Sequence, residues 1–130
     1  MPYLKHVSFL FLALAVSGCR TDYEAVLDAE TPVVVSTKEA IVPLFRRMGR
    51  LSRNCNDGSW FAGSFTTETE FYDRENFGEI IFQATGWYGS GPVLKTIVSD
   101  KGTHRQVEIY GKGFEADLMT QWAQGKTTCR

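Results

Sequence analysis

The chain has 130 residues, of which 14 are basic, 15 are acidic and 43% are hydrophobic, and its formal net charge is −1. This balance excludes the strongly basic surface typical of proteins that bind nucleic acid or anionic membranes by charge. The length suits one domain with one hydrophobic core and is too short for two.

The first 18 residues have the features of an export signal. Lys5 and His6 form a short basic region, and the ten residues 7–16 are apolar. Such a run is long enough for the hydrophobic part of a signal peptide and too short for the roughly 20 residues of a spanning helix. We therefore expect residues 1–18 to be removed on export.

The segment Val16-Ser17-Gly18-Cys19 resembles the lipobox of bacterial lipoproteins. The resemblance implies a diacylglyceryl thioether on Cys19, cleavage before this residue and usually acylation of the new N-terminus. Two or three chains anchor a protein stably, whereas one chain binds reversibly. Arg20 stands where Gram-negative lipoproteins retained in the inner membrane carry Asp, so the resemblance implies the periplasmic face of the outer membrane. The alternative is an ordinary secretory signal followed by a chance cysteine.

The two other cysteines, Cys55 and Cys129, are expected to form a disulfide, because an exported protein enters an oxidising compartment. The alternatives are two free buried thiols or metal ligation. Metal ligation is disfavoured, since neither a CxxC motif nor a neighbouring histidine accompanies these cysteines.

Residues 19–30 are polar and are expected to tether a single domain over residues 31–130 to the lipid. The β-branched run at residues 31–35 predicts a first strand. Ser36 and Glu39 then have the spacing of a capping box.

A helix should follow the capping box and extend to about Arg53. Its expected buried stripe is Ile41, Leu44, Phe45, Met48 and Leu51. Pro43 is expected beyond the first turn, where it would kink the helix or shift its regular part downstream.

From Ser59 the pattern changes to the period of two that is typical of a strand with one wet face. The residues expected on the covered side are Phe61, Gly63, Phe65, Thr67, Thr69 and Phe71. Further strands are predicted over residues 79–85, 93–99 and 105–110, with turns at residues 73–78 and 100–102. A closing helix is predicted from the spacing of Phe114, Leu118 and Trp122, ending at Gly125.

This order predicts an α+β fold in which two helices cover one face of an antiparallel sheet of four to five strands (β-α-β4-α). The order resembles the TBP-like or helix-grip topology, as in the domains of the outer-membrane assembly lipoprotein BamC. Residues 50–55 together with residues 122–129 also look like those of small bacterial lipoproteins. Neither likeness implies an activity.

The residues offer little for catalysis, so we expect no enzymatic activity, no metal and no cofactor. His104 is predicted at a hairpin end, where its ring is solvated. Glu68 and Glu70 share one strand face and could do acid–base chemistry, but a solvated face is the better interpretation. Neither a GxSxG nor an HExxH motif is present.

The segment of residues 86–92 is the strongest candidate for an interaction site. Trp87 and Tyr88 are flanked by glycines, which predicts a mobile loop carrying two large rings suited to a protein partner. The alternative is that one ring folds back as a lid on the core.

A second candidate is the stripe of Arg46, Arg50 and Arg53 on one helix face, with Arg47 beside it. These guanidinium groups could bind phosphate, lipopolysaccharide or an acidic partner. The alternative is a solvated face that complements the C-terminal helix dipole.

Two functions are therefore kept open. The first is a lipid-anchored, non-enzymatic module that binds an envelope protein. The second is a carrier or sensor of a small apolar ligand, for which a cavity lined by Phe61, Phe65, Phe82 and Trp122 would be needed. Trp60 and Trp122 are otherwise expected in or near the core.

Overall fold

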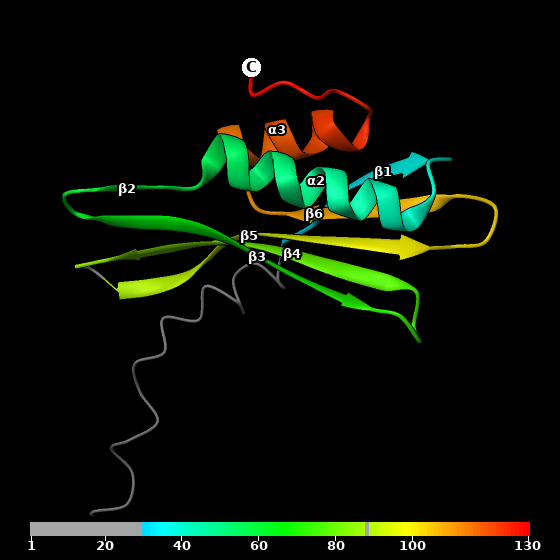
Figure 1. The fold of residues 1–130 in the computed structure, drawn as a ribbon, viewed down its shortest axis with the longest axis horizontal. Helices are drawn as coiled ribbons and strands as arrows, with labels where there is room; N and C mark the ends of the chain where they lie inside the picture. Colours follow the sequence, from blue (N-terminus) through cyan, green and yellow to red (C-terminus); the bar gives the residue numbers. More distant parts are fainter. Residues whose placement is uncertain (1–29, 88) are drawn as a thin grey trace, which may run out of the picture.

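One antiparallel sheet and two helices make up the part of the chain that the structure, a computed structural model, describes, namely residues 30–87 and 89–130 (Figure 1). The expected signal segment, Cys19 and nearly all of the tether lie outside these residues.

The strands in the described residues are β1 (Val33–Thr37), β2 (Gly58–Trp60), β3 (Gly63–Tyr72), β4 (Phe77–Gly86), β5 (Gly89–Asp100) and β6 (Arg105–Tyr110). They lie side by side in the order β1-β6-β5-β4-β3-β2, and every neighbouring pair is antiparallel. The predicted α+β class and the run of four consecutive strands from β3 to β6 are confirmed. β1 starts after Pro32, two residues later than expected, because proline has no backbone N–H to give to a ladder.

The sheet has six strands in the described residues, not four or five, because the chain turns at Phe61 and Ala62. β2 pairs back onto the start of β3, with Gly58 opposite Phe65. The expected single strand from Ser59 is therefore wrong. Two-residue hairpin turns usually contain Asn or Gly, and Phe61 and Ala62 are neither. The alternating pattern continues through these two residues, so no sign of the turn is visible in the sequence.

The helices α2 (Ile41–Asn56) and α3 (Phe114–Ala123) both cover the same face of the sheet (Figure 1). The helices bury Leu44, Phe45, Met48, Leu118, Met119 and Trp122. The sheet buries Ile80, Phe82, Leu94, Val98, Val107 and Ile109. The predicted stripe of α2 is thus confirmed, and β3 exposes Glu68 and Glu70 on the opposite face, as the alternation predicted.

The expected capping box at the start of α2 is wrong. Ser36 and Thr37 remain in β1, paired with Gln106 and Arg105, and α2 begins at Ile41. Its N-cap residue makes no side-chain capping hydrogen bond. Strand pairing holds Ser36 extended, so its hydroxyl is four residues too early to cap the helix.

Pro43 causes no kink, because it is the third residue of α2 and lies within the first turn. The backbone N–H groups of this turn have no intrahelical acceptor in any case. The first hydrogen bond of the turn runs from Leu44 N to the Ala40 carbonyl at 3.1 Å. The helix then continues three residues past the expected end at Arg53.

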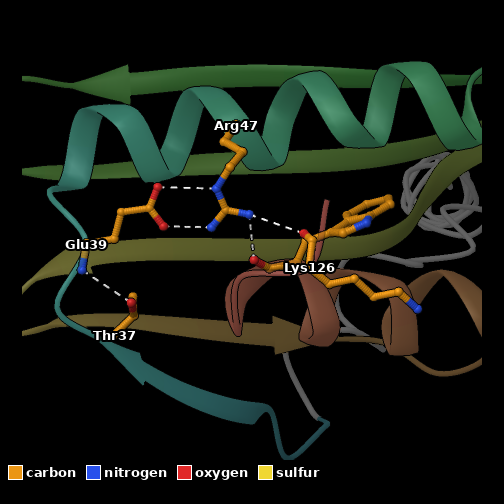
Figure 2. Close-up of polar contacts among 5 residues, drawn as sticks. Thr37, Glu39, Arg47 and Lys126 are labelled. Carbon is orange, nitrogen blue, oxygen red and sulfur yellow. Dashed lines mark hydrogen bonds and ion pairs between the residues drawn. The ribbon is translucent and has the colours of Figure 1, made fainter. Parts of the chain in front are cut away.

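Arg47 joins the two helices (Figure 2). Its guanidinium forms two hydrogen bonds to the Glu39 carboxylate, at 3.2 and 2.7 Å. It also donates to the carbonyl oxygens of Trp122 (2.8 Å) and Lys126 (3.4 Å) at the end of α3. The Trp122 carbonyl also accepts from the backbone N–H of Gly125 at 3.0 Å, so Arg47 adds a second hydrogen bond to it and ties the segment after α3 to α2. Arg47 is therefore a structural residue and not part of the exposed arginine stripe.

The structure contains the disulfide between Cys55 and Cys129, whose Cα atoms are 5.4 Å apart. It links the last turn of α2 to the segment that follows α3, across 74 positions of sequence. The two helices are thus held together at two places, by the disulfide and by Arg47.

Replacing Gly78 by alanine should lower the free energy of unfolding by about 2 kcal/mol, because the site is already filled. A Cβ atom at Gly78 would lie 2.6 Å from two ring carbons of Phe45 and 2.9 Å from Phe71. Urea denaturation would measure the loss. The matched control is Gly58→Ala, where nothing lies within 4 Å of the added carbon, and equal stability of the two variants would contradict this packing.

Candidate functional site

Arg46, Arg50 and Arg53 lie on the outer side of α2 and surround a pocket of about 330 Å³. Phe45, Gly49 and Thr69 complete its lining, so the pocket lies between α2 and β3. We call this feature the arginine pocket. The structure brings together the three arginines that the helical spacing placed on one face.

Gly49 creates the space for this pocket. A Cβ atom there would lie 3.0 Å from Cγ2 of Thr69, so only a residue without a side chain lets α2 and β3 approach this closely without a shift. Arg53 donates a hydrogen bond to the Thr69 hydroxyl and so spans the two elements. Thr69 was expected only on the covered side of its strand, and nothing in the sequence marked Gly49 or Thr69 as a pocket residue, since their role depends on the packing of α2 against β3.

The charges of the arginine pocket are not balanced by the described part of the chain. Among the described residues, no carboxylate lies within ion-pair distance of Arg46 or Arg50, in contrast to Arg47, which binds Glu39. Arg46 and Arg50 are both exposed. Guanidinium groups bind carboxylate and phosphate in a bidentate manner, so this arrangement can receive an anionic group.

Two large aromatic residues protrude at one end of the sheet. Phe61 is 87% exposed in the turn between β2 and β3, and Trp87 is 80% exposed in the turn between β4 and β5. The backbone N–H of Trp87 donates to the carbonyl of Ala62 at 3.4 Å, so the two turns lie side by side. We call this end of the sheet, with Phe61 and Trp87, the aromatic tip.

The expected mobile loop over residues 86–92 is wrong. β4 extends to Gly86 and β5 starts at Gly89, so most of this segment is paired. Pro92 is tolerated within β5 because it lies at the irregularity opposite Phe82 and Gln83, where a proline can sit in a ladder. The alternative of Trp87 as a lid on the core is also wrong, given its exposure, while Tyr88 lies outside the described residues.

The structure does not assemble a catalytic group from the other candidates. His104 is half-buried after β5, with Nδ1 3.1 Å from the Thr103 hydroxyl, and Glu68 accepts a hydrogen bond from Gln83. The pKa of Tyr72 is raised above its ordinary value, chiefly because its hydroxyl hydrogen-bonds to Glu70. Within the described ranges, no three His, Cys, Asp or Glu residues are grouped as metal ligands.

The four residues expected around a ligand cavity do not share one. Phe61 is on the aromatic tip, whereas Phe82 and Trp122 are buried. The rings of Phe65 and Phe82 stack with centroids 5.4 Å apart. Trp122 is a core residue, as expected, and its Nε1 donates to the Thr128 carbonyl at 2.9 Å. The side chain of Trp60 is not among those described.

Comparison with protein-family models, with curated proteins and with solved structures finds no match. In the described part of the chain, no helix has the length and apolar character needed to cross a membrane.

Proposed function

We propose that this protein is a lipoprotein of the bacterial cell envelope, anchored by lipid on Cys19, whose domain binds another envelope protein and catalyses no reaction. The lipobox-like segment and its preceding signal-like run support the anchor, and Arg20 supports the periplasmic face of the outer membrane. The Cys55–Cys129 disulfide is in keeping with an oxidising compartment.

The observation that carries the binding role is the arginine pocket. Arg46 and Arg50 present exposed guanidinium groups beside a pocket, and no carboxylate of the described chain pairs with them. If the arginines served only to keep this face of α2 solvated, no pocket would be needed beside them. Carboxylates of a partner protein would fill the arginine pocket and bind the guanidinium groups of both Arg46 and Arg50. We propose an acidic segment of an envelope protein as the occupant.

We also propose that the domain is of the TBP-like or helix-grip type. Support comes from the order of elements and from α2, which lies along the covered face of the sheet (Figure 1). This likeness concerns the fold alone and adds no activity.

The arginine pocket is tested by native co-purification of the lipidated protein from gently solubilised envelopes. The double variant Arg46→Gln/Arg50→Gln should bind its partner at least about tenfold more weakly, since hydrogen bonds to charged groups contribute about 1.5–3 kcal/mol each. Partner binding by the parent protein should also weaken with added salt. Quantitative mass spectrometry of the recovered proteins measures both effects.

The matched control removes two exposed positive charges elsewhere, in the variant Lys101→Gln/Lys112→Gln. The control should recover the partner as well as the parent protein does. Equal recovery by all three proteins would contradict the arginine pocket. A small apolar molecule recovered without any protein would favour the carrier alternative.

A further inference from the structure

The end of the sheet that forms the aromatic tip carries no charge. Residues 58–67 and residues 80–94 contain no Asp, Glu, Lys or Arg, although 22% of the chain is charged. The pairing register brings these two segments together, with Gly63 opposite Gly86 and Gly86 opposite Gly89. An uncharged end on an otherwise well-charged protein indicates a surface that meets an apolar environment.

The most exposed large apolar side chains on this end are aromatic. Phe61 is 87% exposed and Trp87 is 80% exposed. Indole rings combine an apolar body with one N–H donor, and tryptophan is therefore enriched at the level of lipid headgroups. The phenyl ring of Phe61 has no polar group and is of the kind that interfacial segments bury at the boundary of the acyl chains. The position of Phe61 and Trp87 in adjacent turns lets both rings enter a bilayer surface without unfolding any strand.

The chain enters the sheet from the end that carries the aromatic tip. Val33, at the start of β1, pairs with Ile109, which pairs with Thr96 of β5. From Thr96, β5 extends back seven positions to Gly89 at the tip, a distance of about 23 Å at the usual rise per residue. In Figure 1 the β1 arrow points away from the end where the turn between β2 and β3 lies.

The segment that precedes β1 is long enough to let the tip reach the membrane. Cys19 and Val33 are 14 positions apart, and 14 residues span at most about 46 to 50 Å. This reach is about twice the 23 Å from the level of Val33 to the tip. A lipid on Cys19 and the ring of Trp87 can therefore occupy the same bilayer leaflet.

We propose that the aromatic tip inserts Phe61 and Trp87 into the interfacial layer of the membrane that holds the lipid of Cys19. This inference rests on the proposed lipid anchor and adds a second contact, which fixes the orientation of the domain. Thr69 of the arginine pocket lies six positions along β3 from Gly63, so the pocket stands about 20 Å from the bilayer surface. The pocket is then presented to a partner in the periplasm.

The test measures quenching of Trp87 fluorescence by lipids brominated on their acyl chains. The lipidated protein, with Trp60→Phe so that Trp87 and Trp122 are the two remaining tryptophans, is reconstituted in vesicles of phosphatidylethanolamine and phosphatidylcholine. Trp122 is fully buried, so its emission supplies a background that bromine does not reach. We expect a loss of Trp87 emission that is independent of salt and needs no anionic lipid, because the tip has no charge.

A control protein moves the indole to the opposite end of the sheet, with Trp60→Phe, Trp87→Phe and Lys101→Trp. Lys101 is exposed in the turn between β5 and β6, and its indole should stay unquenched in the same vesicles. Quenching of Trp87 alone supports the inference. Lipidated protein with equal quenching at both positions, or with none, overturns it and would assign the tip to a protein partner or to solvent.

Intact-mass analysis of the same preparations separates this inference from the proposed function. Protein that carries lipid on Cys19 but shows no quenching of Trp87 contradicts membrane insertion of the tip and leaves the anchor in place. Protein without lipid on Cys19 contradicts both.

Discussion

Replacing Cys55 and Cys129 by serine should lower the free energy of unfolding by up to about 4 kcal/mol. The disulfide closes a loop of 74 positions, and loop-closure entropy in the unfolded chain gives a stabilisation of this size. This is a large share of the roughly 5–15 kcal/mol that stabilises a typical domain. Urea denaturation of the oxidised protein and of the double serine variant would measure the difference.

The reduced parent protein is the control for this prediction. Its midpoint in urea should match that of the double serine variant, since both lack the same cross-link. A loss below about 1 kcal/mol would show that the disulfide adds little to the helix contacts that Arg47 already makes.

Replacing Arg47 by methionine should lower the free energy of unfolding by about 3 kcal/mol. Methionine keeps the apolar stem but removes the ion pair with Glu39 and the hydrogen bonds to Trp122 and Lys126. Loss of one partner of a buried ion pair costs about 3–5 kcal/mol. The side chains are partly exposed, 15% for Arg47 and 34% for Glu39, so we expect a cost at the lower end of this range.

Arg46→Met is the matched control for Arg47→Met, because it removes the same charge from the adjacent, exposed position of α2. It should change the stability by less than about 0.5 kcal/mol. A double-mutant cycle with Glu39→Gln should show that Arg47 and Glu39 interact. Equal losses for Arg46→Met and Arg47→Met would contradict the structural role of Arg47.

The periodic parts of the fold were predictable from the sequence. The spacing of Leu44, Phe45 and Met48 indicated the buried side of α2, and β6 has the residues predicted for it, 105–110. These patterns succeed because burial on one face imposes a period of 3.6 or 2 on the residues themselves. Gly125 ended α3 as expected, with a φ of 107° that favours glycine.

The boundaries and turns were harder to predict, because they depend on pairing between distant segments. Ser36 was expected to cap α2, but β6 holds it in a strand. The turn at Phe61 lacks the usual turn residues, and the glycines that flank Trp87 suggested a mobile loop where β4 and β5 are in fact paired. In each case a contact distant in sequence overrides the local preference.

The candidate site was predictable in part. Helical spacing placed Arg46, Arg50 and Arg53 on one face, and the structure places them around one pocket. The sequence placed Arg47 beside this stripe but did not indicate its structural role, since the carbonyl groups that it binds lie 75 and 79 positions away. The sequence left open whether Trp87 is exposed or folds back on the core, and its position beside Phe61 follows only from the pairing of β3 with β4.

The most direct test of the lipid anchor is intact-mass spectrometry of the protein purified from bacterial envelopes. We predict a chain that begins at Cys19, with the added mass of a diacylglyceryl group and an N-terminal acyl chain, and with Cys55 and Cys129 oxidised. The variant Cys19→Ser should carry no lipid. A parent chain that retains residues 1–18, or that is cut at another position and carries no lipid, would contradict the proposal.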